Sequence, residues 1–445
     1  MKLVILRTMT IFKMTKSKRK IMKNFLLFMF VQSLFIGNLL GQNYTGKIEY
    51  GNSIINYEIK LEKVGEQTRA FFTSINMNAY EIPCQQTTFK EGTLKFYVIS
   101  DFFTYEYQYQ IQKENFSGSL KVYSNESEQL LNTFATDLKQ MNFNKEAAIE
   151  KKDVIFSSNG LQLYGTLWKP KNSIQKGMFF VTTSQGNDRS GSNAEAYYFA
   201  NLGYTVFNYD KRGTGKSEGN WQLANIEELS SDDLNALSFF SKTSGLEIDE
   251  IGIKGSSQGG IKIPYILSKL PKLNFGISIS CPDGTLLESD LNHWKNLNET
   301  QIGKKDFKKA FELQKVGYEY LAGKVSYDKV LKLQQKYKGA PWLKYVWIPE
   351  SSVQKDAKLN FSGLPYFKKI SQPILVVQGL SDEIIPLDSY KTIAKAIKKS
   401  KSPKHKVITL KNTSHSMTWL NKEFPYFQTL SPDYLSSVND WLKGL

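Results

Sequence analysis

The amino-acid sequence predicts an α/β domain with a doubly wound, mostly parallel sheet and a helical lid insertion, preceded by a small all-β domain. Three observations support this fold class. Apolar and polar side chains alternate with period two from about residue 43 to residue 124. After Lys151, short apolar runs alternate with helical patterns. Between Ser280 and Gln372 only the helical spacing continues.

The front part of the chain, residues 42–125, is predicted to be an accessory β domain. Its alternating runs Tyr57–Leu61, Leu94–Ile99 and Tyr105–Gln112 are separated by turn residues, which is typical of antiparallel strands with one solvated face. We expect a sandwich or a barrel, followed by a linker at 126–151 with a helix around Gln129–Met141. The β domain holds none of the three histidines, so we expect no chemistry there.

Residues 152–445 are predicted to form the α/β domain. Near-continuous apolar strands joined by crossover helices indicate a parallel sheet that is covered on both faces. The expected strands are 177–183, 204–210, 250–255, 275–280 and 373–379, and the expected helices are 194–203, 226–242 and 259–270. Residues of about 283–365 interrupt this alternation and are expected to form a helical cap.

Residues 1–41 are typical of a secretory signal peptide. A basic start precedes the apolar run Phe25–Leu40, and Met22 is a second candidate for the true start. We expect cleavage near Gly41–Gln42 and a secreted or periplasmic protein. The apolar run is shorter than the roughly 20 residues that a membrane span needs, so no stable membrane span is expected after cleavage.

The charge does not require a nucleic-acid partner. The formal net charge is +16, but residues 1–41 carry eight Lys or Arg and no acid, which leaves +8 on the remaining chain. Both signs are mixed along that chain, as on an ordinary solvated surface. The two cysteines, Cys84 and Cys281, lie far apart, and we expect buried thiols there, neither a disulfide framework nor a metal site.

The stretch Gly255–Gly259 contains the pattern G-x-S-x-G between an apolar strand and an amphipathic helix. In this context the pattern is typical of a nucleophile elbow, a sharp turn that forces the serine, here Ser257, into a strained backbone conformation. The residues two before and two after it must then be small, as Gly255 and Gly259 are. The amide of Gln258 would lie at a helix N-terminus, where partial positive charge favours an oxyanion.

A serine hydroxyl needs a base to remove its proton. His415 follows a predicted strand in a polar loop, and functional groups of open α/β sheets gather at the carboxyl ends of strands. We therefore expect His415 to be the base, and His293 and His405 to be exposed or structural.

The third member of a triad would be an acid that follows a strand, between the serine and the histidine in the chain. The strand Ile374–Gln378 leads into Asp382, whose carboxylate would hold the imidazole tautomer and stabilise the imidazolium. Glu383 is the neighbouring alternative.

The stretch Tyr209–Asn220, YDKRGTGKSEGN, looks like a phosphate-binding loop. The first glycine of a P-loop would fall on Asp210, and Glu218 stands where the dinucleotide pattern has its third glycine. The stretch therefore lacks one required glycine of each phosphate-binding pattern. The hypothesis that the protein is a nucleotide hydrolase would rest on this stretch alone.

Ser257, Asp382 and His415, in this order and context, resemble the α/β-hydrolase superfamily over roughly residues 152–445. The similarity is closest to secreted bacterial esterases and serine-aminopeptidase-like hydrolases, which often carry a helical cap between the sixth and seventh strands. A β domain like the one at the front also recurs ahead of such hydrolases.

The resemblance also assigns roles to two loops. It implies that Asp210 and Arg212 belong to a structural loop of the form D-x-R-G-x-G-x-S. It implies that the second oxyanion amide comes from Thr182–Gly191, where Ser184, or else Gln185, would supply it.

The main functional hypothesis is a serine hydrolase that cleaves carboxylic esters through an acyl-enzyme on Ser257, without a metal or a cofactor. A peptidase acting on short peptides would use the same triad and would need a group for the substrate amine, such as Glu312 or Glu319 in the cap. A non-catalytic binding protein on a hydrolase scaffold is a third hypothesis. The expected ligand is a small ester or a short peptide. The sequence does not indicate whether the protein is a monomer or an oligomer.

Overall fold

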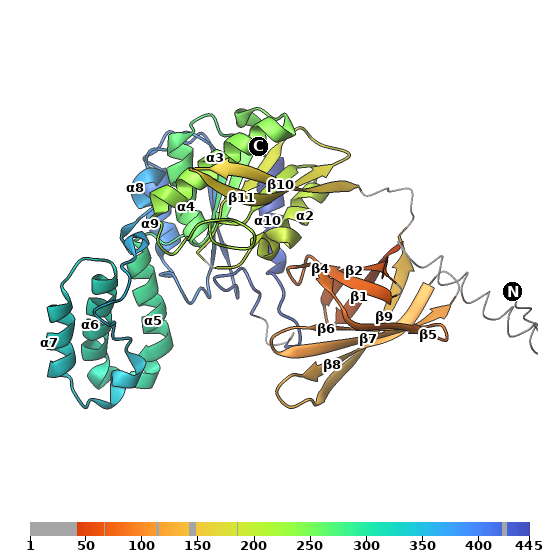
Figure 1. Cartoon of the computed structure of the whole chain (residues 1–445), viewed down its shortest axis with the longest axis horizontal. Helices are drawn as coiled ribbons and strands as arrows, with labels where there is room; N and C mark the ends of the chain where they lie inside the picture. The colour runs from red at the N-terminus through yellow and green to blue at the C-terminus, as the bar shows by residue number, and fades with distance from the viewer. Residues whose placement is uncertain (1–41, 66, 113–114, 142–147, 185, 421–424) are drawn as a thin grey trace, which may run out of the picture. The chain divides into compact units, whose positions relative to one another are not determined.

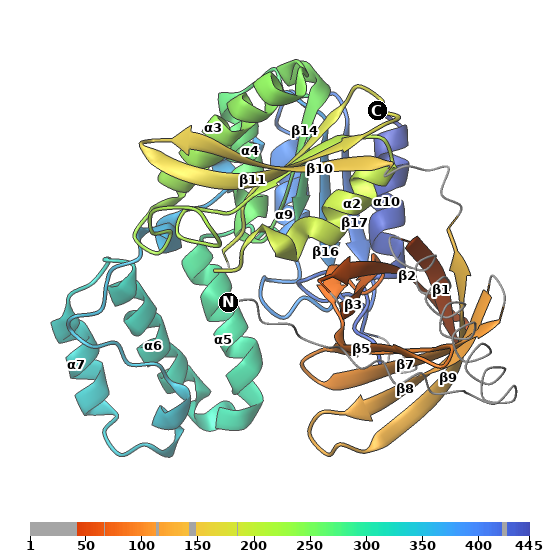
Figure 2. The same cartoon turned by 45° about the vertical axis from the view of Figure 1, so that its right-hand side comes forward.

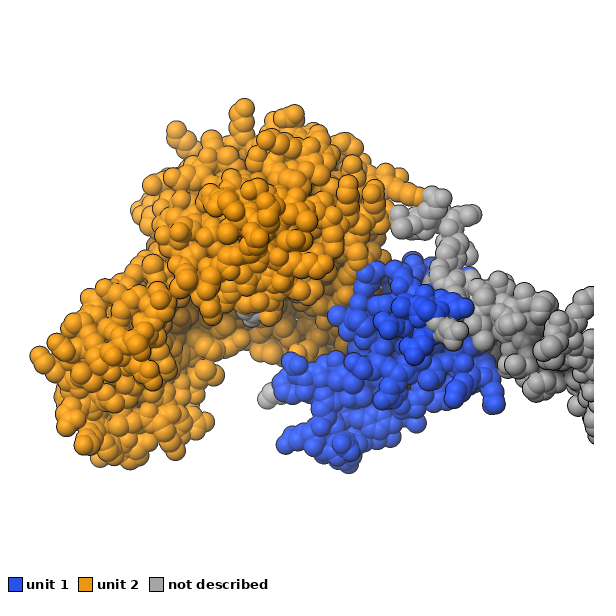
Figure 3. Space-filling view, in the orientation of Figure 1, with its two compact units in different colours: residues 1–48, 58–72, 81–143 blue, residues 49–57, 73–80, 144–445 orange. Residues whose placement is uncertain are grey.

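The computed structural model describes residues 42–445, apart from 66, 113–114, 142–147, 185 and 421–424. The predicted signal peptide, residues 1–41, lies outside the described residues. The chain divides into two compact units, which Figure 3 shows in two colours. One unit comprises residues 1–48, 58–72 and 81–143, and the other comprises residues 49–57, 73–80 and 144–445.

The front part of the chain forms one nine-stranded sheet with the strand order β4-β3-β2-β1-β9-β8-β7-β6-β5. Its strands are β1 Gln42–Tyr50, β2 Ser53–Val64, β3 Gln67–Ser74, β4 Ala79–Pro83, β5 Gln85–Lys90, β6 Thr93–Ile99, β7 Phe103–Gln112, β8 Asn115–Ser124 and β9 Leu130–Gln140. From β5 to β9 each strand pairs antiparallel with the next, and β9 pairs antiparallel with β1. The predicted all-β domain is therefore confirmed.

This sheet curls until strands that are distant in its order face each other (Figure 1). The ring centroids of Phe72 in β3 and Tyr107 in β7 are 5.8 Å apart. Alternate residues of β2, among them Tyr57 and Ile59, are buried. The buried residues of the period-two pattern thus form the apolar interior of a single curled sheet. The sandwich alternative, which requires two packed sheets, is wrong.

The expected linker with a helix around Gln129–Met141 is also wrong, because residues 130–140 form strand β9. Phe134, Thr136 and Leu138 are buried while their neighbours are exposed, as period two requires. Leu131, Phe134 and Leu138 also fit a helical spacing. The two patterns coincide at Phe134 and Leu138, and pairing with β1 and β8 decides between them.

The second sheet has eight strands in the order β10-β11-β13-β12-β14-β15-β16-β17. They are β10 Ile149–Ser158, β11 Leu161–Pro170, β12 Gly177–Phe180, β13 Thr205–Tyr209, β14 Ile251–Ser256, β15 Phe275–Ile279, β16 Ile374–Gly379 and β17 His405–Leu410. Strand β11 pairs antiparallel with β10 and β13, and all pairings from β13 to β17 are parallel. The predicted mostly parallel sheet is confirmed, although it begins at Ile149, slightly before the expected boundary.

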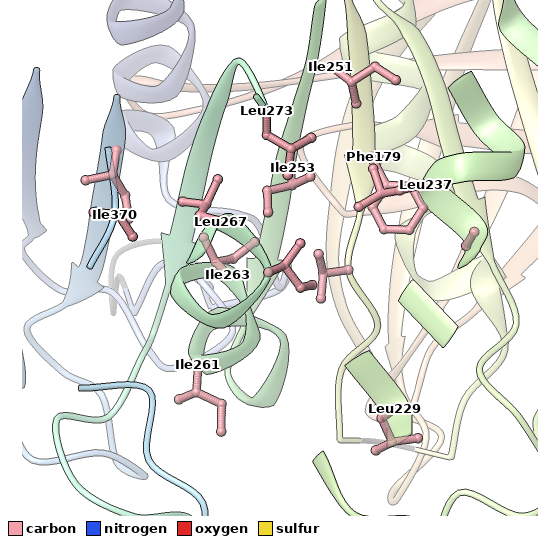
Figure 4. Close-up of a cluster of buried hydrophobic side chains, with 14 of the residues drawn as sticks. Phe179, Leu229, Leu237, Ile251, Ile253, Ile261, Ile263, Leu267, Leu273 and Ile370 are labelled. Carbon is pink, nitrogen blue, oxygen red and sulfur yellow. The ribbon is translucent and has the colours of Figure 1, made fainter. Parts of the chain in front are cut away.

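Helices cover both faces of this sheet (Figures 1 and 2). On one face are α2 Asn193–Asn201 and α10 Pro432–Lys443, and on the other are α3 Ile226–Ser244, α4 Gln258–Lys269 and α9 Ser389–Ile397. Neighbouring residues of β12 face opposite cores: Phe179 packs with α3 and α4, whereas Met178 packs with α2. Figure 4 shows Phe179 beside Leu237 of α3. Burial on both faces explains why these strands are apolar without alternation.

The predicted cap is present between β15 and β16, the sixth and seventh strands of the sheet. It contains α5 Leu286–Ile302, α6 Lys304–Leu321, α7 Tyr327–Lys336 and, toward its end, α8 Leu364–Phe367. The cap has a core of its own around Trp294, Leu313 and Trp342. A bridge between Thr285 and Ser362 joins its two ends. Among the described residues, no helix is long and apolar enough to cross a membrane.

Replacement of Phe179 by alanine is expected to lower the free energy of unfolding by about 3–5 kcal/mol, the usual cost of deleting a buried aromatic ring. Phe179 is fully buried and stacks on Phe207 with 6.0 Å between ring centroids. Denaturant unfolding followed by fluorescence would measure the change. The control is Leu223→Ala, at a side chain that is 62% exposed, and equal small losses in both variants would contradict the core assignment.

Candidate active site

Ser257 occupies the turn between β14 and α4, with φ 55° and ψ −120°. A positive φ is costly for a residue with a Cβ, so the surrounding structure must hold this conformation. A Cβ added to Gly255 would lie 2.6 Å from the carbonyl oxygen of Gly259. A Cβ added to Gly259 would lie 3.1 Å from the carbonyl oxygen of Thr182. The crowding expected from the G-x-S-x-G pattern is therefore present.

The hydroxyl of Ser257 is not used to cap α4, although Ser257 directly precedes this helix. Its backbone N–H donates to the carbonyl of Ile279 at the end of β15, at 2.9 Å. Gln258 is the first residue of α4, where a backbone N–H has no acceptor within the helix. The elbow thus places a hydroxyl beside a helix N-terminus, an arrangement that favours negative charge on a neighbouring oxygen.

His415, in the loop after β17, is hydrogen bonded to Asp382, in the loop after β16. Nδ1 of His415 lies 2.9 Å from Oδ2 and 3.0 Å from Oδ1 of Asp382. Oδ1 also accepts the backbone N–H groups of Ile384 and Ile385, at 2.9 and 3.0 Å. Both side chains of the pair are buried. A carboxylate held from behind by two amides orients the ring, so Nε2 is turned away from Asp382.

The loops after β16 and β17 are held against each other by backbone contacts. The N–H of Ser381 donates to the carbonyl of Thr413 at 3.0 Å. A Cβ at Gly379 would lie 2.2 Å from that same carbonyl oxygen, so only glycine permits this approach. The carboxylate of Glu383 accepts the backbone N–H of His415 at 3.3 Å. Glu383, the alternative acid, thus contacts the backbone of His415, while Asp382 contacts its ring.

A cavity of about 300 Å³ opens at the carboxyl edge of the parallel strands. Ser257, His415 and Ser184 all line it. Its wall combines polar and apolar side chains and also includes Thr182, Thr183, Asp188, Arg189, Glu195, Lys211, Lys254, Ile384 and Tyr434. The structure therefore brings the expected nucleophile, the expected base and the expected second oxyanion residue to one cavity, with Asp382 behind His415.

The strand order and the serine elbow together define the architecture of this part of the chain. Two antiparallel strands precede a parallel sheet, the order of β12 and β13 is exchanged, and the elbow follows the fifth strand, β14. This is the α/β-hydrolase fold. The hydrolase domain carries its cap after the sixth strand, as the resemblance implied.

No family model and no curated protein matches the chain. Among solved structures, the chain is similar to an esterase from Pyrococcus furiosus, with 16% identity over 67% of this chain and 92% of that chain and a TM-score of 0.45. It is similar to an α/β hydrolase from Penicillium, with 19% identity over 66% and 97% of the two chains and a TM-score of 0.42.

An acylaminoacyl peptidase from Pyrococcus horikoshii is also similar, with 17% identity over 81% of this chain and 57% of that chain and a TM-score of 0.40. At this distance the similar structures do not identify a substrate. The fold of the hydrolase domain follows from its own strand order and elbow.

The segment Thr182–Ser184 lines the cavity after β12. It contains the residue expected to be the second oxyanion donor and is called the oxyanion loop below. Its first residue is held by Asp233 of α3, whose Oδ1 accepts the N–H and the hydroxyl of Thr182, both at 3.3 Å. Oδ1 also accepts the hydroxyl of Tyr209 at 2.7 Å, and Oδ2 accepts Nζ of Lys262 at 2.7 Å. Burial raises the pKa of Asp233, while the Lys262 ammonium opposes that shift.

Because Lys262 belongs to α4, this buried ion pair connects the oxyanion loop to the helix that begins at the elbow. Ser184 lies in the cavity wall, as expected for the second oxyanion donor. The alternative donor, Gln185, lies outside the described residues.

The glycine-rich stretch 209–220 encloses a carboxylate of its own chain. Asp210 is fully buried, and its Oδ2 accepts the backbone N–H of Lys216 at 3.0 Å and Nη1 of Arg189 at 2.6 Å. Gly215 has a φ of 54°, and a Cβ there would lie 2.3 Å from that same oxygen. A P-loop closes around a phosphate, whereas this loop closes around Asp210.

Two further polar side chains of this loop, those of Arg212 and Ser217, also form contacts within the protein. Arg212 pairs with Asp232 of α3, with 2.5 Å between Nε and Oδ2. The hydroxyl of Ser217 donates to the carbonyl of Asp210 at 2.7 Å and accepts the N–H of Tyr164 at 2.9 Å. Asp210 and Arg212 therefore lie in a structural loop.

The other two histidines have other surroundings than His415. His405 is the exposed first residue of β17. His293, on α5 of the cap, has Nδ1 3.2 Å from the carbonyl oxygen of Glu383, so it joins the cap to the loop after β16. Cys84 and Cys281 are both free thiols; Cys281 is buried as expected, whereas Cys84 is only partly buried, so the expectation of a buried thiol there is wrong.

The charged residues near the cavity that were not singled out in the sequence include Lys211, Asp233 and Lys262. One signal was available for Lys262, because it interrupts the apolar run of α4 between Ile261 and Ile263. A charge within an apolar helical face indicates a buried partner. The sequence does not identify that partner, because Asp233 belongs to another helix.

Gly215→Ala is expected to lower the free energy of unfolding by about 3 kcal/mol or more, since backbone strain and overpacking against the buried Asp210 each cost about 1–3 kcal/mol. Gly245→Ala is the matched control, because Gly245 has a φ of 78° but open space around a new Cβ. Its loss should be limited to strain, about 1–2 kcal/mol. Thermal or denaturant unfolding of both variants would measure the two changes in the free energy of unfolding. Equal losses of stability would show that the packing around Asp210 is not tight.

Proposed function

We propose that the protein is a serine hydrolase that cleaves carboxylic esters through an acyl-enzyme on Ser257. One observation carries the proposal: Ser257, on its strained elbow, lines the same cavity as His415, whose ring is held by Asp382. A nucleophile, a base and an orienting carboxylate in this relation are the components that acyl transfer requires. Every chemical role is filled by a side chain or an amide of this chain.

In the proposed first step, Oγ of Ser257 attacks the ester carbonyl carbon while its proton passes to Nε2 of His415. Collapse of the tetrahedral intermediate breaks the bond to the alcohol, which leaves with that proton. In the second step, water gives a proton to the same nitrogen and attacks the acyl-enzyme. The acid is then released and the proton returns to Ser257. Asp382 stabilises the imidazolium that forms in both steps.

The negative charge of each intermediate is proposed to be stabilised by two backbone N–H groups, those of Gln258 and Ser184. Gln258 contributes the N-terminal amide of α4, together with the partial positive charge of that helix end. Removal of one such donor typically slows turnover by about 10²–10³-fold.

The occupied carboxylates of the cavity favour an ester over a peptide with a free amine. Asp188 accepts the N–H of Ser190 at 2.9 Å, and Glu195 accepts the hydroxyl of Tyr434 at 2.7 Å. Glu195 is also paired with Lys254. A substrate ammonium would have to share the carboxylate with these partners.

The two cap residues considered for an amine are also engaged. Glu312 accepts the hydroxyl of Tyr337 at 2.8 Å, and Glu319 lies 3.6 Å from Nζ of Lys329. These contacts support the ester hypothesis over the peptidase hypothesis.

A fluorophosphonate probe tests the proposal directly, because it forms a stable adduct only with an activated serine. We expect one adduct, located on Ser257 by mass spectrometry and absent from Ser257→Ala. Ester and aminoacyl-anilide substrates would then separate esterase from peptidase, with ester turnover expected to be faster. Absence of an adduct in folded protein would favour a non-catalytic binding protein.

Asp382→Asn is expected to lower kcat by about 10³–10⁴-fold with little loss of stability. The asparagine keeps an oxygen for the N–H groups of Ile384 and Ile385, but its amide no longer accepts the N–H of the imidazole. Steady-state ester hydrolysis measures the loss. Glu383→Gln is the control and should cost less than about tenfold, because its remaining oxygen still accepts the His415 N–H. A larger loss in Glu383→Gln would reassign the acid.

Export is proposed on the basis of residues 1–41. The mass of the protein recovered from the culture medium or the periplasm would test this proposal. We expect a mass that corresponds to an N-terminus at or near Gln42. Recovery of the whole chain in the cytoplasm would contradict the proposal.

A further inference from the structure

We infer that Lys211 is a positioning residue that holds the oxyanion loop, and with it the N–H of Ser184, by binding the carbonyl groups of Thr183 and Ser184. The inference deepens the proposed function and rests on it. It assigns a role to a residue of the glycine-rich stretch that neither phosphate binding nor the structural loop explains.

The ammonium of Lys211 contacts two successive carbonyl groups of the loop. Nζ lies 2.8 Å from the oxygen of Thr183 and 3.1 Å from the oxygen of Ser184. The carbonyl of Thr183 and the N–H of Ser184 belong to the same planar trans peptide, so they point in opposite directions. A charge-assisted hydrogen bond to that carbonyl therefore also determines the direction of the N–H.

Turning this peptide over would present a carbonyl oxygen where an oxyanion needs a donor. It would also break the hydrogen bond from the ammonium of Lys211, which is buried and would lose an acceptor. Lys211 thus opposes the one backbone motion that would disable the proposed donor.

Lys211 is itself held in place and is not a mobile surface side chain. It is only 4% exposed, and its Nζ lies 4.0 Å from the centroid of the Trp221 ring. The backbone around Trp221 is fixed in turn by Lys358, whose Nζ donates to the carbonyl of Gln222 at 2.9 Å. An ammonium between an aromatic face and two carbonyls has restricted geometry.

Successive peptides of the oxyanion loop are therefore held by side chains from other elements. Asp233 accepts the N–H of Thr182, and Lys211 binds the carbonyls of the next two residues. A loop whose peptides are anchored in this way meets the requirement that an oxyanion hole be organised before the charge forms.

The charge on Lys211 is sensitive to pH near neutrality. Burial, with the positive charges of Lys262 and Lys358, lowers the pKa of Lys211 to about 7, while Asp233 opposes the shift. Above that pH the neutral amine has one N–H fewer and no charge, so its hold on the two carbonyls weakens. Activity should therefore decline as the pH rises through this value.

This decline would not reflect unfolding caused by Lys211. The ordinary pKa of a lysine is 10.5, so between about 7 and that value the unfolded chain binds more protons at this residue than the folded chain. The titration of Lys211 then stabilises the folded state as the pH rises. Thermal unfolding over the same pH range would separate the two effects.

The test compares Lys211→Met, which removes the charge and the donors at similar length, with Lys216→Met. Lys216 is exposed on the same loop, and the control removes the same charge. We expect Lys211→Met to lower both kcat and the rate of fluorophosphonate labelling by about 30-fold, less than loss of a donor costs. KM should change little, and Lys216→Met should behave as the wild type.

Lys211→Arg is the conservative variant. An arginine stays charged at all relevant pH values, so it should retain most of the activity and lose the decline above neutral pH. A folded Lys211→Met with kcat and labelling rate within threefold of the wild type would overturn the inference. If Lys211→Met does not fold, Lys211→Arg decides, because a decline identical to that of the wild type would also overturn it.

The labelling rate separates this inference from the proposed function. Wild-type protein that fails to label would defeat the proposed function itself. Wild-type protein that labels at the same rate as folded Lys211→Met would defeat only the role of Lys211.

Discussion

The candidate site depends on one physical constraint: the loops at the carboxyl edge of the parallel sheet are partly buried, so the protein itself must satisfy their polar groups. Buried charged side chains meet much of this requirement. Asp210 lies at the centre of the glycine-rich loop, and Asp233 accepts hydrogen bonds from three elements. Asp382 accepts two backbone N–H groups as well as the N–H of His415. An isolated buried charge would be costly, so each of these carboxylates accepts several hydrogen bonds.

The same constraint explains where glycine is required. Gly215 makes room for the Asp210 carboxylate, and Gly379 makes room for the backbone of the histidine loop. Gly255 and Gly259 allow the chain to turn at Ser257. A Cβ at Gly215, Gly379 or Gly255 would overlap an oxygen atom, and a Cβ at Gly259 would be in tight contact with one. The residue type is therefore set by a neighbour and not by the local chain direction alone.

The hydroxyl of Ser280, at the end of β15, donates to the carbonyl of His415 at 2.6 Å. The neighbouring carbonyl of Ile279 accepts the N–H of Ser257. The end of one strand thus touches the backbone of both the proposed nucleophile and the proposed base. Small displacements there would move the two together, which preserves their relative geometry better than independent loops would.

Several parts of this site could be predicted from the sequence because their signals are local. The G-x-S-x-G pattern identifies the elbow, and polar residues directly after apolar strands identify Asp382 and His415. Where two local patterns coincide, local reasoning fails. Phe134 and Leu138 fit both a helix and a strand, and the choice was made by hydrogen bonds to the preceding strand β8 and to β1, which is remote in sequence.

The sequence by itself determined the class of the fold, the place of the cap and the residues proposed for chemistry, because periodicity and strand ends are properties of short segments. Only the tertiary structure decided what surrounds them. The partners of Lys211, Lys262 and Asp233 come from different strands and helices, and no spacing along the chain records which charges meet. Their roles follow from burial, which forces each charge to find a partner and is created only when the layers pack.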